Sequence, residues 1–476
     1  MKLSALLQGV KTLNAFEDVE IERVTDKDKD TKENTLFVCI DGNQYDGHKI
    51  AETVLSKGAK AILTERDLKI DKQIIVENTR VAYSQIASNF YEIPTKNLKI
   101  IGVTGTNGKT STSFFIKNML KSMGYKCGLI GTVENDFGNG KIESVLTTPE
   151  PMELQRLFRN MVDNGCEYCV MEVSSQALAQ KRVYGVEFEV SILTNITVDH
   201  LDYHGTMENY INSKLQLFEN SKKAIVNVDN DNVKSAFRRI KCPIVTCSTV
   251  ENSAFYTAKN IVCNEDYIQY ELVGMSCIGR ISVNLPGEFT VYNSLLASAS
   301  LLELGFSIDS VSKSAEKIEK VKGRAEKVPV PKNFTVIIDY AHTPDGLENI
   351  LNCIKGFSKG RIITVFGCGG DRDKSKRAPM GKIVGEMSNI AVVTSDNPRT
   401  ENPLLIINDI LGGMEKTKSK LAIIENRRQA IEFALGKARK GDVVLLAGKG
   451  HETYQIIGNE KIPFDEREII KEYFKE

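Results

Sequence analysis

The sequence feature that most constrains the fold is a repeated alternation of short apolar runs with helical patterns. In the middle of the chain the apolar runs are Leu98–Thr104, Tyr168–Val173, Ser191–Thr194 and Ala224–Val228. The alternation restarts after residue 331 with Thr335–Ile338, Ile362–Phe366, Ile390–Thr394 and Val443–Leu446. Such alternation is typical of parallel sheets covered by helices. Each run ends in a polar loop rich in Gly or Asp, and these loops are where ligands bind in open α/β sheets.

Length and linkers predict three domains in the 476 residues. A polar stretch around Pro94 ends the first domain, because proline disfavours helix at the preceding residue. A second boundary falls near Gly323–Pro331. We therefore expect domains at 1–97, 98–325 and 326–476. Within the first domain, a strand at Phe37 leads into a Gly- and Asp-rich loop that ends at His48. Within the second, shorter alternating strands over 242–290 predict an antiparallel annex.

Composition excludes several classes of protein. Lys plus Arg and Asp plus Glu both number 62, so no net charge points to nucleic acid or to an anionic membrane. The N-terminus lacks the apolar run and cleavage site of a signal peptide, and no apolar stretch has the length of a membrane span. We therefore expect a cytoplasmic enzyme that acts on small molecules, without a nucleic-acid or membrane partner, and that is a monomer.

The ten cysteines are scattered and lie mostly in apolar runs, which predicts buried free thiols in a reducing compartment. Cys166-Glu-Tyr-Cys169 has the spacing of a redox motif or half of a zinc site. No second pair or histidine lies at a zinc-like distance along the chain. The interpretation as core cysteines is therefore favoured.

A glycine-rich turn, Gly105-Thr-Asn-Gly-Lys-Thr110, separates the strand that ends at Thr104 from a helix with apolar residues at intervals of four. Backbone N–H groups in such a turn, together with a helix N-terminus, can bind phosphate. Lys109 would reach the terminal phosphates, and the Thr110 hydroxyl would coordinate Mg²⁺. The strict GxxxxGK[ST] spacing is not met, because Val103 stands where its first glycine would be. The alternative is a chance glycine turn.

Four of the five histidines follow predicted strands, namely His200, His204, His342 and His451. The first two lie in an acid-rich loop, which predicts a second metal site; the alternative is a solvated turn. Glu172 ends an apolar strand, where a Mg²⁺ ligand opposite a phosphate loop would lie. A single glutamate at a strand end is otherwise unremarkable.

Further motifs recur in a fixed order along the chain. They are Gly105–Thr110, Thr147–Glu150, Glu172–Gln176, Asp199–Gly205, Asn293, Gly323–Glu326, Asp339–Asp345, Gly369–Lys374, Asp396–Arg399 and Gly448–Glu452. With these motifs the chain resembles the Mur ligase family over its whole length. Leu36-Phe-Val, Asp46-Gly-His48 and Asp396-Asn-Pro-Arg399 are most similar to the members that add the third amino acid of the cell-wall peptide.

The resemblance implies an α/β fold of three domains: a small N-terminal domain that binds UDP, a central P-loop-type ATPase domain with a mostly parallel sheet, and a Rossmann-like C-terminal domain. It also implies an ATP-dependent amide ligase of peptidoglycan synthesis, with roles in cell shape and division. The ligase would add meso-2,6-diaminopimelate to UDP-N-acetylmuramoyl-L-alanyl-D-glutamate. A carboxylate must be activated before an amine can attack it, and an acyl phosphate made from ATP does this.

The resemblance assigns each matching residue a role. Those implied to hold ATP are Gly105, Thr106, Asn107, Gly108, Lys109, Thr110, Ser111, Asn293, Arg324, Asp339 and His342. The ligands of two Mg²⁺ ions are Thr110, Glu172, His200 and a carbamylated Lys214, and Lys109, Glu172, His200 and Lys214 are catalytic. The residues implied to bind the UDP-muramyl dipeptide are Asp28, Thr147, Thr148, Ser174, Gln180 and Arg182. The residues implied to bind diaminopimelate are Arg372, Asp396, Asn397, Pro398, Arg399, Gly448 and Glu452.

The chain departs from the family pattern at two positions. Asp28 stands where the family usually has a serine that contacts uridine, and this puts UDP binding by the first domain in doubt. Thr290 stands where the family usually has asparagine, a difference for which we have no interpretation.

Alternatives to this function remain open from sequence. L-Lysine or meso-lanthionine could replace diaminopimelate, although a second carboxylate on the substrate matches the guanidinium of Arg399. A folylpolyglutamate synthase-like ligase shares the phosphate loop, but the N-terminal domain and the loop at 396–399 argue against it. A nucleotide-binding scaffold that has lost turnover is opposed by Lys109, Glu172, His200 and Lys214.

Overall fold

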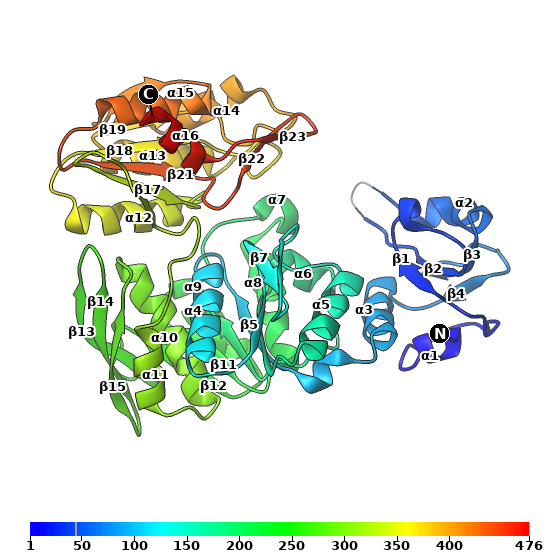
Figure 1. The fold of residues 1–476 in the computed structure, drawn as a ribbon. Helices are drawn as coiled ribbons and strands as arrows, with labels where there is room; N and C mark the ends of the chain where they lie inside the picture. Colours follow the sequence, from blue (N-terminus) through cyan, green and yellow to red (C-terminus); the bar gives the residue numbers. More distant parts are fainter. Residues whose placement is uncertain (43–44, 476) are drawn as a thin grey trace.

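The computed structural model describes residues 1–42 and 45–475, which form three α/β units in chain order (Figure 1). Each unit is built on its own sheet, and the three sheets have four, eleven and six strands. The predicted α/β fold class is confirmed. Residues 43 and 44 of the predicted loop before His48 lie outside the described residues. Within the described ranges, no helix combines the length and the apolar character needed to cross a membrane.

The first unit has a parallel sheet in the order β1-β2-β3-β4. Its strands are β1 (Arg23–Thr25), β2 (Thr35–Val38), β3 (Ala59–Thr64) and β4 (Gln73–Ile75). Its helices are α1 (Leu3–Leu6), α2 (Ala51–Ser56) and α3 (Thr79–Phe90), with 3₁₀ turns η1 (Asp28–Asp30), η2 (Gly47–Ile50) and η3 (Pro94–Asn97). Strand β2 is buried along its whole length, because α1 and α3 cover one face of the sheet and α2 the other.

The central sheet has the order β15-β14-β13-β12-β11-β10-β5-β9-β6-β7-β8. The parallel strands are β5 (Lys99–Thr104), β6 (Cys127–Ile130), β9 (Tyr168–Glu172), β10 (Val190–Leu193), β11 (Ala224–Asn227) and β12 (Ile244–Ser248). Antiparallel strands extend both ends: β7 (Glu134–Asp136) and β8 (Lys141–Glu143), and β14 (Ile268–Gly274) and β15 (Ile278–Val283) beyond β13 (Tyr256–Cys263).

Helices cover both faces of the central sheet (Figure 1). One face carries α4 (Lys109–Ser122), α10 (Glu288–Glu303) and α11 (Ile308–Ala315). The core on the other face includes α5 (Pro151–Asp163), α8 (Met207–Leu215) and α9 (Asp231–Ala236). The remaining short elements are α6 (Ser175–Ala179), α7 (Leu201–His204), η4 (Gln216–Asn220) and η5 (Phe237–Arg239).

The prediction of an antiparallel annex of shorter strands over 242–290 is confirmed for β13, β14 and β15, which pair antiparallel, but it is wrong for β12 and for the strand lengths. Strand β12 is parallel to β11, and β13 in turn pairs in parallel with β12, so these strands continue the central sheet. Strands β13, β14 and β15 have eight, seven and six residues, against six in β5. Alternation reported which faces are buried, but it carries no information about strand partners.

The third unit has the strand order β16-β17-β21-β18-β19-β20, in which only β16 is antiparallel to its neighbour. The strands are β16 (Glu326–Val328), β17 (Thr335–Asp339), β18 (Ile362–Phe366), β19 (Ile390–Val393), β20 (Lys420–Ile423) and β21 (Val443–Ala447). A hairpin of β22 (Tyr454–Ile457) and β23 (Glu460–Pro463) follows. Helices α12 (Pro344–Phe357), α13 (Arg377–Met387) and α14 (Pro403–Leu411) cover one face, and α15 (Arg427–Lys437) and α16 (Glu466–Tyr473) the other.

The cysteines are all free, and six are buried, including Cys166 and Cys169. Of this pair, Cys169 lies on a strand and Cys166 does not, because β9 begins at Tyr168. Cys263 at the end of β13 is exposed, which departs from the prediction of buried thiols.

A buried ion pair joins helices α15 and α16, which cover the same face of the sheet in the third unit. Arg427 donates to Glu466 at 2.9 Å and to the Ala447 carbonyl at 2.9 Å, and both charged side chains are fully buried. Its neighbour Arg428 pairs with Glu472 at the surface. The pair thus anchors the end of β21, from which the loop at Gly448 departs.

We expect Arg427→Met to destabilise the protein by about 3 kcal/mol, because it leaves the carboxylate of Glu466 buried without a partner. Arg428→Met, the matched surface control, should change stability by less than about 1 kcal/mol. Denaturant unfolding of the two variants checks this. Equal losses of stability in the two variants would show that the buried pair contributes no more to stability than the surface pair.

Candidate active site

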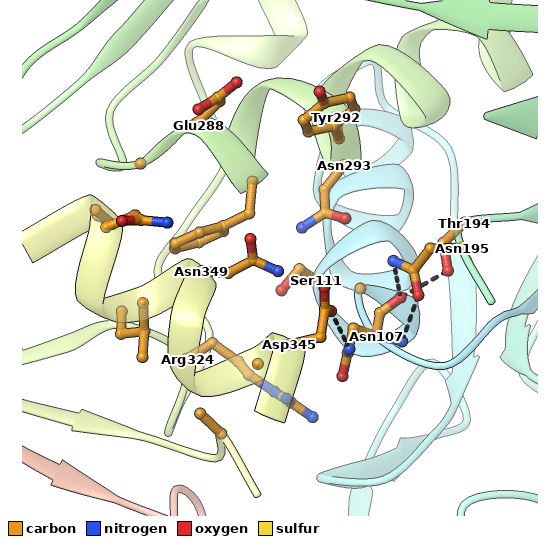
Figure 2. Close-up of a pocket in the computed structure, with 18 of the residues that line it drawn as sticks. Asn107, Ser111, Thr194, Asn195, Glu288, Tyr292, Asn293, Arg324, Asp345 and Asn349 are labelled. Carbon is orange, nitrogen blue, oxygen red and sulfur yellow. Dashed lines mark hydrogen bonds between the residues drawn. The ribbon is translucent and has the colours of Figure 1, made fainter. Parts of the chain in front are cut away.

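A cavity of about 740 Å³ lies between the central and third units (Figure 2). The central unit contributes the loop before α4, the loop after β10 and the first turns of α10. The third unit contributes the end of β17 and helix α12. Figure 2 shows Asn293 and Tyr292 of α10 on one side, and Asp345 and Asn349 of α12 on another.

The glycine-rich turn joins β5 to α4 as predicted. Gly105 has φ 145°, and a Cβ there would lie 1.9 Å from Thr194 Oγ1, so no other residue fits. Gly108 has φ 84° and is the N-cap of α4. Asn107 donates its backbone N–H to Asn195 Oδ1 at 2.8 Å. The turn is therefore held against the end of β10, and the N-terminus of α4 faces the cavity.

Lys109 folds back over this turn. Its ammonium donates to the carbonyls of Gly105 and Thr106 at 2.9 and 2.8 Å. Burial lowers its pKa, and the carboxylate of Glu172 acts in the opposite direction. The lysine thus stands beside the site where a phosphate would lie on the N-terminus of α4.

Glu172 ends β9 and is fully buried. Its carboxylate accepts hydrogen bonds from the Thr110 hydroxyl at 2.9 Å and from both the N–H and hydroxyl of Thr132, at 2.8 and 2.9 Å. Arg324 also donates to the Thr110 hydroxyl at 2.9 Å. A carboxylate and a hydroxyl side by side are the hard oxygen ligands that Mg²⁺ prefers, so this pair fits the ion.

Lys214 of α8 is 1% exposed and donates to the Gly105 carbonyl at 2.8 Å. Its ammonium also lies 4.3 Å from the centre of the Tyr210 ring. Burial, and then the charge of Lys109, hold its pKa well below the usual value. The half-buried His200 has a lowered pKa because of burial and the nearby Lys214 and Lys109, although Asp199 opposes this. The structure therefore brings Lys109, Lys214 and His200 together.

His204 does not join this group as a second imidazole ligand. It lies inside α7 and not in a loop, it is buried, and its Nε2 is 2.9 Å from Ser175 Oγ. Across residues 1–42 and 45–475, no three His, Cys, Asp or Glu side chains are placed to hold a metal ion by themselves. The prediction that two histidines and the acids of this loop form a metal site is wrong for His204.

The third unit supplies Asp339 and His342 at the cavity wall. Asp339 accepts from the N–H groups of Ala325 and Ala341, both at 2.7 Å, so it ties the segment that joins the two units to the end of β17. His342 Nδ1 lies 2.8 Å from the Tyr340 carbonyl. Arg324 lies over the Tyr340 ring at 4.8 Å. Asn293 and Ser111 line the cavity from the central unit.

The loop after β19 places Asp396, Asn397, Pro398 and Arg399 beside the loop after β21. Asn397 donates to Glu452 at 3.0 Å, and Lys449 donates to Asn397 at 2.9 Å. Gly448 has φ 112°, and a Cβ there would lie 2.6 Å from Asp396 Oδ2.

The two arginines expected to bind an amino acid also converge. Burial, and then the charge of Arg372, lower the pKa of Arg399. Arg399 has φ 51° and donates to the Gly370 carbonyl at 2.8 Å. Arg372 donates to the Asp371 carbonyl. Among the residues that the structure describes, neither arginine forms an ion pair with a carboxylate. Two close guanidinium groups that are not held in an ion pair are suited to binding an anion.

The residues expected to bind UDP-muramyl dipeptide form one cluster, except Asp28. Arg182 donates to the Thr148 carbonyl at 2.8 Å and to Gln180 at 2.6 Å, and the Thr148 hydroxyl accepts from the Ser174 N–H at 3.0 Å. Thr147 Oγ1 lies 3.1 Å from Thr132 Oγ1. Asp28 is half-exposed and pairs with Lys57 at 2.5 Å in the first unit.

Sequence reasoning missed Thr132 and Asn195, which hold Glu172 and the phosphate turn. Thr132 follows β6, an apolar run that ends in Gly131, so the rule of polar residues after strands would have found it. Asn195 follows Thr194 by the same rule.

The fold and the cavity define an α/β protein of several units, with a turn suited to binding phosphate beside a cavity between two of them. Comparison with models of protein families identifies the family. Residues 103–301 match the Mur ligase middle domain, 323–450 the Mur ligase glutamate ligase domain, and 29–107 the Mur ligase family catalytic domain. The chain belongs to the Mur ligase family.

Individual proteins resemble the chain over nearly its whole length. UDP-N-acetylmuramoyl-L-alanyl-D-glutamate–2,6-diaminopimelate ligase of Clostridium botulinum is 46% identical over 465 residues, 96% of each chain. A solved structure of a ligase with the same name has a TM-score of 0.66 at 29% identity, and the match covers 96% of this chain and 95% of that one. MurF ligase of Thermotoga maritima, solved in complex with ADP, has a TM-score of 0.62 at 19% identity, covering 95% and 97%.

Proposed function

We propose that this chain is a ligase that uses ATP to join meso-2,6-diaminopimelate to UDP-N-acetylmuramoyl-L-alanyl-D-glutamate, in cytoplasmic peptidoglycan precursor synthesis. The observation that carries this proposal is the 46% identity, across 96% of both chains, to the ligase of that name from Clostridium botulinum. We assign the muramyl substrate to the domain at 1–97 and its border with the central domain, ATP to 98–325, and the amino acid to 326–476.

ATP fits the cavity between the central and third domains. The N-terminus of α4 and Lys109 would hold its phosphates, and Asn293, Arg324, Asp339 and His342 would line the rest. Mg²⁺ fits the oxygen atoms of Thr110 and Glu172, and there it would supply positive charge beside the phosphates. Lys109 would neutralise charge as the substrate carboxylate attacks the γ-phosphate and forms the acyl phosphate.

Lys214 suits carbamylation because its amine is held below its usual pKa by burial. A neutral amine adds CO₂ to form a carbamate and releases one proton. The product is an anion with two oxygen atoms, close to His200 and Lys109, and it would serve as a ligand for a second Mg²⁺. The conversion also removes the repulsion between the ammonium groups of Lys214 and Lys109.

Arg399 and Arg372 support diaminopimelate as the amino acid. Diaminopimelate carries a second carboxylate that L-lysine lacks, and a guanidinium can hold a carboxylate through two parallel hydrogen bonds. Meso-lanthionine keeps both carboxylates and is expected to fit the same pair of arginines.

The purified protein should form the UDP-muramyl tripeptide when it is given ATP, Mg²⁺, the UDP-muramyl dipeptide and diaminopimelate. Product mass and ADP release are the measurements. Lys109→Ala should stay folded and lose product formation, since its side chain serves the ligand and not the core. ADP release without tripeptide, whichever amino acid is offered, would exclude the proposed reaction.

Lys214→Ala should be inactive, and short carboxylic acids that refill the gap should restore part of the activity. Lys222→Ala, which removes a surface lysine paired with Glu189, is the matched control and should behave like wild type. Intact mass after trapping of carbamates should show one added CO₂ in wild type that is missing from Lys214→Ala. Full activity of Lys214→Ala would refute the carbamate.

Arg399→Ala should lose affinity for diaminopimelate while ATP affinity stays unchanged, because its guanidinium lies in the amino-acid loop. In the wild type, L-lysine should be joined at least about 100-fold less efficiently, since it leaves the guanidinium groups of Arg399 and Arg372 without an anion. Steady-state kinetics with both amino acids test this. Equal efficiency with L-lysine would overturn the specificity while leaving the ligase intact.

A further inference from the structure

An ion pair crosses from the third unit to the central unit beside the catalytic residues. Lys376 is the N-cap of α13, and its ammonium lies 3.6 Å from Asp199 Oδ1. Both side chains are nearly buried, at 11% and 5% exposure. Asp199 also accepts the His200 N–H at 3.0 Å, so the carboxylate contacts the His200 turn on one side and the third unit on the other.

We propose that Lys376 is a positioning residue, which holds the Asp199–His200 turn of the central unit in place against two loops of the third unit. These loops, 369–374 after β18 and 396–399 after β19, carry Arg372 and Arg399 and are called the amino-acid loops below. This rests on the proposed ligase function. It concerns how the amine-bearing domain is docked on the phosphate-bearing one, and not which groups bind the substrates.

Charge explains why a lysine at this place needs Asp199. Lys109, Lys214 and Arg324 already bring positive charge to this region, and the charge of Lys376 lowers the pKa of His342, after burial. An almost buried ammonium among cations is costly unless a carboxylate offsets it. Within the described residues, Asp199 is the carboxylate with which Lys376 forms an ion pair. The contact therefore exists only while the two units are docked.

The backbone of Lys376 is connected to the amino-acid loops through the next residue, Arg377. The adjacent Arg377 is 1% exposed and binds Glu401 at 2.8 Å and Asp409 at 2.9 Å. Glu401 in turn accepts the Asp371 N–H at 2.6 Å.

Hydrogen bonds to backbone carbonyls also join the loop that carries Arg372 to the loop that carries Arg399. The Gly370 N–H donates to the Asn397 carbonyl at 2.9 Å, and Arg399 donates to the Gly370 carbonyl at 2.8 Å. A Cβ at Gly370 would lie 1.9 Å from the Pro398 carbonyl oxygen, so the two loops cannot separate from or slide past each other without loss of this packing. Lys376 thus fixes the position of both arginines relative to His200.

Docking matters because the amine must reach the activated carbonyl carbon. A displacement of about 1 Å between reacting groups can cost about two orders of magnitude in rate. Loss of Lys376 should therefore lower kcat and leave ATP binding unchanged, since the ATP-binding residues named above do not include it.

The test compares Lys376→Met, Lys376→Arg and the control Lys382→Met. Lys382 lies on the same helix, 65% exposed, with a long contact to Glu386 at 4.0 Å. We expect Lys376→Met to lower kcat about 30-fold, within the range for loss of one partner of a buried charge pair. ATP affinity should stay within about twofold, measured by calorimetry. Lys376→Arg should recover most of the rate, and Lys382→Met should match wild type.

Asp199→Asn and the double variant with Lys376→Met separate positioning from general instability. If the two side chains act as a pair, the double variant should be no slower than the slower single variant. Additive losses, a normal kcat in Lys376→Met, or an equal loss of ATP affinity would overturn the proposal. Wild type is assayed first: absence of tripeptide there defeats the ligase function itself, whereas an active wild type with an active Lys376→Met defeats only the role of Lys376.

Discussion

The site depends on the close packing of a backbone turn against the end of a neighbouring strand. Gly105 lies against Thr194 so tightly that a single added carbon atom would overlap the threonine oxygen. This contact sets the direction in which the chain enters α4. It thereby aims the helix N-terminus, Lys109 and Thr110 at one place. The carbonyl of the same glycine accepts hydrogen bonds from the ammonium groups of both Lys109 and Lys214, so Gly105 holds the two lysines beside each other.

The parallel order of the strands explains why residues distant in sequence converge. Strands β9 and β10 flank β5, so Glu172 and Thr194 end beside the glycine turn at the same edge. In the third unit, β19 and β21 flank β18 and deliver Asp396 and Gly448 to one edge. The candidate site residues lie at these strand ends, in agreement with the rule that open α/β sheets bind ligands at the carboxyl ends of their strands.

Much of this could be predicted from sequence because the strand ends are marked by polar residues after apolar runs. The turn at Gly105, the carboxylate of Glu172 and the loop at Asp396 all follow such runs. His204 also follows an apolar run in the sequence, yet it lies at the end of helix α7 and forms a hydrogen bond with the Ser175 hydroxyl. The partners of β13 and the contact of Lys376 with Asp199 could not be predicted, because they depend on which surfaces meet after folding. Periodicity reports burial and not partners.

Cationic side chains lie close together at two places in the candidate site. Lys109, Lys214, Arg324 and Lys376 lie near one another, and the carboxylates beside them are Glu172, Asp199 and Asp339. In the third unit, Arg372 lies close to Arg399, and the carboxylates of Asp371, Asp396 and Glu452 partly offset their charge. Charges of like sign that are held together by packing store unfavourable energy, which anionic ligands relieve. The folded protein is therefore arranged to become more stable as its anionic substrates bind, and the contacts between the central and third units should tighten with them.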